Sequence, residues 1–278
     1  MDIMYIASHS LYPTCGPICK NNTWARMVEV QAFQKLKQWD IPLYLAVGSV
    51  KPEIHCDAKI YARDAVDLYI KGIKDNGGLV KGLTMDWPLS AGSETCGQTM
   101  EETANHVVNY VKTVTDGYAL HHPGQKIDIG TWEGTPTFTA DQLITWMNLL
   151  ISKGYKPHHF IADFDHERFR REGKLPLMRS YLLKLQNYCR ANGILYGVAI
   201  WGNDLRSPTT YYAQARKYAQ EVKRATGGPD FIQVISWEYW VQKQNAGDVF
   251  PYNLPETDPL SHTHFFSEML QYFKVPTL

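Results

Sequence analysis

The sequence carries no net charge, and this absence excludes several kinds of partner. Among its 278 residues, 28 Lys and Arg balance 28 Asp and Glu. Proteins that bind nucleic acid or an anionic membrane surface need clustered Lys and Arg side chains. We therefore expect no nucleic-acid partner, and a ligand that is uncharged or recognised by local contacts.

Long apolar runs are missing as well. No stretch approaches the roughly 18 apolar residues that a membrane-spanning helix requires. The first residues, Met1–Tyr5, lack the basic segment and following apolar segment of a signal peptide. We expect a soluble monomer without membrane contact, whose chain as given carries no signal peptide.

Cysteine is scarce, and its spacing does not predict a zinc site. The five cysteines are Cys15, Cys19, Cys56, Cys96 and Cys189. The first two are close enough to share a metal ion, but no second Cys or His pair has a matching spacing. The first four lie in predicted loops and could form two disulfides, or all five could be reduced thiols. Cys189 lies in a helical pattern, where we expect a buried free thiol. The loop cysteines slightly favour a secreted or extracytoplasmic protein.

Aromatic residues are abundant, with eight Trp and 17 Tyr. A hydrophobic fraction of 44% can build a large core, which excludes a disordered chain. The length permits one or two domains, because α/β barrels run to about 250 residues as one unit.

Short apolar runs of strand character alternate with longer segments of helical period. The predicted strands are Ile3–Ser8, Pro42–Val47, Val80–Met85, Ile127–Thr131, His159–Ala162, Ile194–Ile200 and Phe231–Ser236. The predicted helices are Thr23–Trp39, Ala62–Asn76, Met100–Thr115, Ala140–Lys153, Leu177–Ala191, Tyr211–Ala225 and Thr263–Phe273. Parallel neighbouring strands need a crossover helix between them, so this order predicts βα units.

Two α/β architectures are built from such units. An open doubly wound sheet usually has a Gly-rich nucleotide loop after its first strand, and the sequence contains no such loop. Seven or more βα units at this length favour a (β/α)8 TIM barrel, as a single catalytic domain over residues 1–278. No convincing apolar run lies between Trp240 and Ser261, so we expect a short or distorted eighth strand.

Carboxylates and tryptophans follow five of the predicted strands. These segments are Asp86-Trp87, Trp132-Glu133, Asp163-Phe164-Asp165-His166-Glu167, Trp201-Gly202-Asn203-Asp204 and Trp237-Glu238-Tyr239-Trp240. The carboxyl ends of barrel strands form one rim, so we expect these side chains to converge. Trp faces offer flat apolar area to a sugar ring, and carboxylates and amides bind its hydroxyls. Taken singly, each acid could equally cap the helix that follows it.

This pattern resembles the (β/α)8 glycoside hydrolases, particularly the large retaining group whose two catalytic glutamates end strands four and seven. With Ile3–Ser8 counted as strand one, those positions fall on Glu133 and Glu238. The resemblance implies that Glu133 is the acid/base and Glu238 the nucleophile of a two-carboxylate mechanism. Trp132 stands where that group usually has an Asn.

A second set of acids also resembles a sugar-cleaving motif. Asp163-x-Asp165-x-Glu167 is similar to the end of the chitinase-type motif, in which the final Glu is the acid. The leading Asp of that motif falls on Phe160 and is absent.

Two other function classes use the same side chains. Metal-dependent barrels typically carry an H-x-H pair on strand one, which here offers only His9. Asp163, Asp165 and His166 could hold a divalent ion but lack further ligands. A barrel that binds glycans without cleaving them would use the tryptophans and acids as contacts alone.

We therefore expect a glycosidase that acts in polysaccharide degradation and needs neither a metal nor a cofactor. Its catalytic residues are predicted to be Glu133 and Glu238. Its substrate-binding residues are predicted to be Asp86, Trp87, Trp132, Asp163, Asp165, Trp201, Asn203, Asp204, Trp237 and Trp240.

Overall fold

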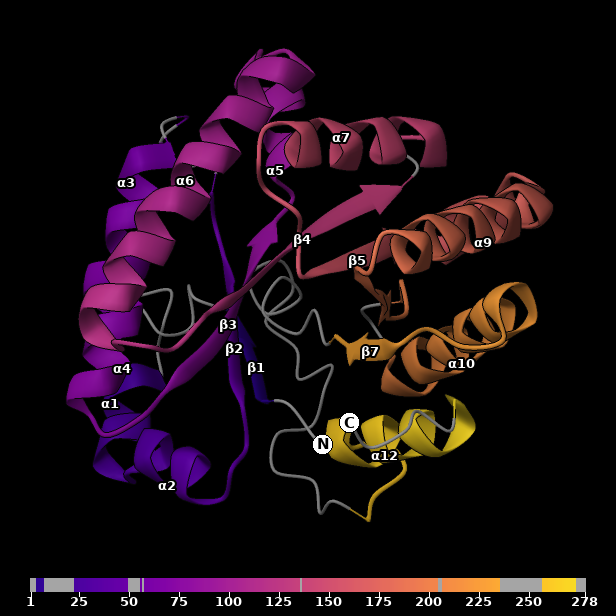
Figure 1. Ribbon diagram of the computed structural model, residues 1–278. Helices are drawn as coiled ribbons and strands as arrows, with labels where there is room; N and C mark the ends of the chain where they lie inside the picture. Colours follow the sequence, from indigo (N-terminus) through magenta and orange to yellow (C-terminus); the bar gives the residue numbers. More distant parts are fainter. Residues whose placement is uncertain are drawn as a thin grey trace. The chain divides into compact units, whose positions relative to one another are not determined.

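The structure, a computed structural model, describes residues 4–7, 23–49, 56, 58–135, 137–204, 207–235 and 257–273. Within them it is an α/β fold of seven parallel strands that alternate with helices (Figure 1). The strands are β1 (Met4–Ala7), β2 (Leu43–Val47), β3 (Val80–Asp86), β4 (Asp128–Thr135), β5 (His159–Phe164), β6 (Leu195–Ile200) and β7 (Phe231–Val234). All seven coincide with predicted strands, which confirms the α/β class.

The helices also follow the predicted order. They are α1 (Thr23–Glu29), α2 (Ala32–Gln38), α3 (Ala58–Asp64), η2 (Ala65–Ile70), α4 (Lys71–Asp75), α5 (Pro88–Ser90), η3 (Ala91–Thr95), α6 (Met100–His121), α7 (Ala140–Ser152), α8 (His166–Arg171), α9 (Leu175–Ala191), α10 (Pro208–Thr226) and α12 (His262–Phe273). The region predicted as one helix over Thr23–Trp39 is two helices. Gln31 separates them because its backbone is left-handed, with φ 54°, a conformation that ends a right-handed helix.

The described chain forms two compact units. The first contains the residues up to Glu133 together with Thr145–His159, and the second contains Gly134–Ile144 and the residues from Phe160 to Pro276. The single (β/α)8 catalytic domain over 1–278 stays a prediction. Most of the region expected to hold the eighth strand, between Trp240 and Ser261, lies outside the described residues.

In the first unit, β1 to β4 pair in sequence order, each parallel to the next. Successive side chains of a strand point to opposite faces of the sheet, so each strand contributes residues to both faces. One face is apolar, with buried side chains such as Leu45, Leu83, Met85 and Ile129. The other face is more polar and includes Thr84. In the sequence, the predicted strands are almost wholly apolar. The difference between the apolar face and the more polar face becomes visible only from the strand register.

Close packing on the polar face depends on two glycines. At Gly82, a β-carbon would lie 2.2 Å from the Tyr44 ring, whose hydroxyl donates to Asp128 Oδ2 at 2.7 Å. At Gly130, a β-carbon would lie 2.2 Å from the His159 ring. Each glycine therefore leaves room for a ring from a neighbouring strand.

In the second unit, β6 and β7 pair in parallel, and long helices follow β5 and β6. Helix α10 begins at a Ser207 cap, where the side chain accepts from Thr210 N, and ends at left-handed Gly227. A bidentate ion pair between Arg216 and Glu268 joins α10 to α12. Cys189 of α9 is a buried free thiol, as predicted.

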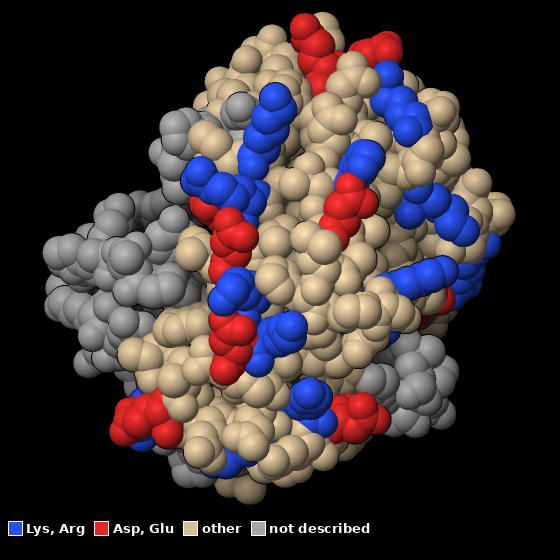
Figure 2. Space-filling model, turned by 60° about the vertical axis from the view of Figure 1, so that its left-hand side comes forward, with Lys and Arg blue, Asp and Glu red and all other residues tan. Residues whose placement is uncertain are grey.

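The surface carries mixed charge, as the composition suggests. Exposed pairs such as Lys71–Asp75 and Lys112–Asp116 lie one turn apart on α4 and α6, and pairs this exposed contribute little to stability. Over the middle of the face in Figure 2, basic and acidic side chains are interspersed. No helix in the described ranges is long and apolar enough to cross a membrane.

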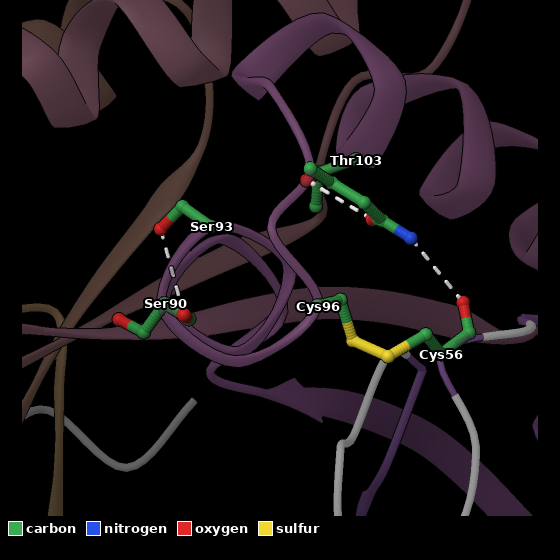
Figure 3. Close-up of a disulfide and its surroundings, with 6 residues drawn as sticks. Cys56, Ser90, Ser93, Cys96 and Thr103 are labelled. Carbon is green, nitrogen blue, oxygen red and sulfur yellow. Dashed lines mark hydrogen bonds between the residues drawn. A yellow bond between two sulfur atoms is a disulfide. The ribbon is translucent and has the colours of Figure 1, made fainter.

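A disulfide joins Cys56 to Cys96, 40 residues apart in the sequence (Figure 3). It is one of the pairings that the four loop cysteines allowed. Cys15 and Cys19 lie outside the described residues. The bond connects the segment before α3 to the end of η3, within the first unit.

Replacing both Cys56 and Cys96 with Ser should lower the free energy of unfolding by roughly 2–4 kcal/mol, because the cross-link restricts the unfolded chain. Urea unfolding of the oxidised wild type and of the variant measures this difference. The wild type under a thiol reductant should fall to the stability of the variant. Equal stability of all three samples would contradict a stabilising disulfide.

Candidate functional site

The side chain of Glu133 is completely buried, with 0% of its surface exposed. Its carboxyl group receives three hydrogen bonds from the start of α5. Leu89 N donates to Oε1 at 2.6 Å, and Ser90 donates to Oε2 through N at 3.4 Å and Oγ at 3.2 Å. The first N–H groups of a helix have no partner within the helix, so a carboxyl group is a suitable acceptor for them.

This arrangement has a local cause in the sequence. Trp87 precedes α5 at the N-cap position, but its side chain makes no capping hydrogen bond. Pro88 fixes the first helical residue. Glu133 from β4 therefore takes the place of a local capping residue. Leu89 and Ser90 were missed in the sequence, although the proline marked a helix start that needed an acceptor.

Glu133 does not share a face with its predicted partners on β3 and β4. Asp86 is paired with Trp132 in the sheet register, which places these two on the same face. Glu133 follows Trp132 in the strand, so its side chain points to the opposite, apolar face. Trp132 itself is 5% exposed.

Burial raises the pKa of Glu133 from 4.5 to about 8. The hydrogen bonds from Leu89 and Ser90 act in the opposite direction, and the negative charge of Asp86 adds to the rise. Glu133 is consequently mostly protonated at neutral pH, the state that a general acid requires.

Trp87 lies at the carboxyl end of β3 and is 37% exposed. Its backbone is left-handed, with φ 51° and ψ 46°, and its N–H donates to Trp132 O at 2.9 Å. For a bulky residue this conformation costs about 1–2 kcal/mol. Such strain is commonly found at functional positions, and here it presents an indole ring to solvent beside the end of the strand.

Four predicted residues meet at the ends of β5 and β6, all within the second unit. Trp201 Nε1 donates to Asp163 Oδ1 at 2.6 Å. Asn203 Nδ2 donates to Asp165 Oδ1 at 2.9 Å, and this oxygen also accepts from Arg168 N at 3.0 Å. Asp165 thus caps α8 while contacting the neighbouring strand end. The carboxyl ends of these two strands therefore meet, whereas convergence of all five strand ends stays a prediction.

The turn after β6 and the acid Glu167 are each held by a neighbouring side chain. The backbone N–H groups of Asn203 and Asp204 donate to Gln214 Oε1 at 2.7 and 2.8 Å, which fixes the turn after β6. Glu167, in the first turn of α8, is buried and accepts from Arg170 Nε at 2.8 Å. Gln214 had no signal in the sequence, because it lies in the middle of a helical pattern.

The proposed nucleophile Glu238 and its neighbours Trp237 and Trp240 lie outside the described residues. The other residues of the predicted rim are divided between the two compact units. The first unit holds Asp86, Trp87, Trp132 and Glu133, and the second holds Asp163, Asp165, Trp201, Asn203 and Asp204.

A polar cluster that the sequence did not reveal occupies the first unit. Thr84 Oγ1 and His159 Nε2 are 2.7 Å apart, and both side chains are buried. His158 links this pair to Asp128, with Nε2 3.6 Å from Oδ1. Burial lowers the pKa of His159 to about 3, so the ring is neutral. Among the residues with described positions, no group of three or more His, Cys, Asp or Glu could hold a metal ion.

No protein-family model matches this chain, and no curated protein matches its sequence. Its fold is similar to that of a fungal β-1,4-galactanase, with a TM-score of 0.55 at 13% identity over 96% of this chain and 88% of that one. It is also similar to a glucosidase from Croceicoccus marinus, with a TM-score of 0.54 at 13% identity over 95% of this chain and 55% of that one. The chain thus spans little more than half the length of that glucosidase. At such identity the likeness shows the fold alone, which resembles TIM-barrel glycoside hydrolases.

The pKa of Glu133 has a consequence for stability that can be measured. Because its folded value of about 8 lies above the ordinary 4.5, the folded state binds more protons than the unfolded state between these values. The stabilisation is fully present below pH 4.5 and is lost as the pH rises through 8. Glu133→Gln does not titrate, so the stability of the variant relative to wild type should rise across this window, by up to about 1.4 kcal/mol per pH unit.

Urea unfolding of both proteins across this pH range measures the difference. The lowered pKa of His159 makes stability rise with pH up to its unfolded value of 6.5. That contribution is present in both proteins and cancels in the comparison. A difference that does not change with pH would show that Glu133 is ionised throughout.

Proposed function

We propose that the chain is a glycoside hydrolase that cleaves O-glycosidic bonds of an oligo- or polysaccharide. The observation that carries this proposal is the cluster of acids with indole and amide groups at the carboxyl ends of the strands. Asp163 with Trp201, and Asp165 with Asn203, are its best-defined members. These groups suit a neutral, hydroxyl-rich ligand, and glucosidase and galactanase structures share the fold.

The proposed mechanism uses two glutamates. Glu238 attacks the anomeric carbon while Glu133 donates its proton to the leaving oxygen, and Glu133 then takes a proton from the water that hydrolyses the glycosyl-enzyme. The raised pKa of Glu133 supports the acid role, because the carboxyl group carries a proton at neutral pH. Its hydrogen bonds to Leu89 and Ser90 oppose that role. Its side chain also points to the sheet face opposite Asp86 and Trp132. Proton transfer to a substrate therefore requires α5 to release the carboxyl group and the side chain to turn toward the strand ends.

A second choice of catalytic acids within the same function is Asp163 and Asp165. Both lie at the carboxyl end of β5 and contact side chains that follow β6. The chitinase-like reading of this segment adds Glu167 as the acid. Glu167 is buried and its Oε2 accepts from Arg170 Nε at 2.8 Å, so this oxygen already has a partner within the protein.

A glycan screen with matched variants separates these assignments. We expect wild type to release reducing sugar from at least one plant, fungal or bacterial polysaccharide. Glu238→Gln should abolish this activity, and Glu133→Gln should lower kcat by about 10²–10⁴-fold, because each removes a group of the chemical step.

The Asp163→Asn and Asp165→Asn variants serve as the comparison set. Activity that survives both Gln substitutions but not these two would move the mechanism to the end of β5. Binding of a glycan by wild type without release of sugar would identify a non-catalytic glycan-binding protein and overturn the proposed activity.

Trp87 provides a test of the sugar-binding surface. Glycine accepts the left-handed backbone at this position, so Trp87→Gly should change the free energy of unfolding by no more than about 1 kcal/mol. If the ring stacks on a sugar, the variant should bind the glycan at least about tenfold more weakly, a loss of ~1.4 kcal/mol. Trp39→Gly is the control, because Trp39 is a 64% exposed tryptophan on another element. Unchanged affinity in Trp87→Gly would exclude Trp87 from the site.

A further inference from the structure

The segment that binds Glu133 is connected at its other end to the disulfide. Helices α5 and η3 run without a break over residues 88–95, and Cys96 follows directly. Leu89 and Ser90 at the beginning of this segment donate to Glu133. Cys96 at its end is bonded to Cys56. One short helical segment therefore lies between a buried carboxyl group and a covalent cross-link.

The beginning of the segment is buried, over Pro88–Ser90, whereas Glu94 and Thr95 near its end are exposed. Figure 3 shows the contacts around this end. Gly92 packs so closely on α6 that a β-carbon there would lie 2.3 Å from Thr103 Oγ1. Thr103 Oγ1 donates to Thr99 O at 3.0 Å and lies 3.3 Å from Gln98 Oε1, and Gln98 Nε2 donates to Cys56 O at 3.4 Å. The contacts of the Gln98 side chain are long, so they are weak. The Gln98 N–H donates to Gly92 O at 2.8 Å, and the disulfide is the covalent restraint at this end of the segment.

The disulfide is open to a reagent in solution. Cys56 is exposed and Cys96 is half-buried, whereas the Cys189 thiol is buried and far less accessible. Exposed disulfides exchange with external thiols more readily than buried ones. The bond that restrains the segment is therefore also the bond that a reductant reaches.

We propose that the Cys56–Cys96 disulfide is a redox-sensitive clasp that keeps the α5–η3 segment seated on Glu133. A dithiol opens the clasp by thiol–disulfide exchange. It gives two electrons and two protons to the two sulfur atoms, which become thiols, and is itself oxidised to a disulfide. The segment, then held by its buried residues Pro88–Ser90 and Gly92 and by the Gln98 contacts, opens more often and takes its two N–H donors away from the carboxyl group.

The clasp controls how often Glu133 is free of its cap, which is a step that its proposed role as an acid requires. The proposed clasp rests on the proposed function only for this link to catalysis. The seating of α5 on Glu133 can be measured in the absence of any substrate, so a failed glycan screen leaves this test intact.

Amide hydrogen exchange of the full chain, read residue by residue by NMR, tests the clasp. In oxidised wild type, the Leu89 and Ser90 amides should be protected. Dithiothreitol, or the Cys56→Ser/Cys96→Ser double substitution, should speed their exchange by at least about tenfold. The Leu83 amide of β3, which is buried in the same unit, is the reference for unfolding of that unit and should speed up by a smaller factor than Leu89 and Ser90. Acceleration at Leu89 and Ser90 that does not exceed the acceleration at Leu83 would overturn the proposal.

A matched variant identifies the responsible cysteines. Cys15→Ser/Cys19→Ser removes the other two loop cysteines and should keep the full response of Leu89 and Ser90 to dithiothreitol. Cys56→Ser/Cys96→Ser should give fast exchange with or without the reductant. A response that is lost in the Cys15→Ser/Cys19→Ser variant would overturn the assignment to the Cys56–Cys96 bond.

Discussion

The carboxyl group of Glu133 has to be solvated from within the protein, and the arrangement around β3, α5 and β4 depends on this constraint. The group is fully buried. Water is replaced by the N–H groups of Leu89 and Ser90, which an isolated helix would leave without partners. Each side therefore satisfies a requirement of the other: α5 gains a cap, and the buried acid gains donors.

The same constraint shapes the chemistry that the site can perform. Donors to a carboxylate favour its charged form, and burial favours the neutral form. Burial is the larger effect for Glu133, so the proton stays bound at neutral pH. An acid in this state is ready to donate, but the contacts that hold it also shield it. The acids at the end of β5 are placed differently, since Asp163 and Asp165 contact polar groups that follow the next strand.

Much of this fold could be predicted from the order of apolar runs and helical segments, because the crossover rule for parallel strands leaves few alternatives. The break at Gln31 could not, since nothing in its neighbours signals a left-handed residue. The face of the sheet on which each side chain lies could not be predicted either. Trp132-Glu133 reads as one motif in the sequence, but a strand sends adjacent side chains to opposite faces. Pairing Glu133 with Leu89 and Ser90 required knowing that β3 and β4 are neighbours.

The contact between Gly130 and the His159 ring limits how this part of the chain can vary. A side chain at position 130 would occupy the space that the imidazole fills, and a smaller residue at 159 would leave a cavity beside Thr84. The side chains at positions 130 and 159 therefore share one limited space between β4 and β5. In relatives that retain this packing, a larger residue at the first position should accompany a smaller one at the second.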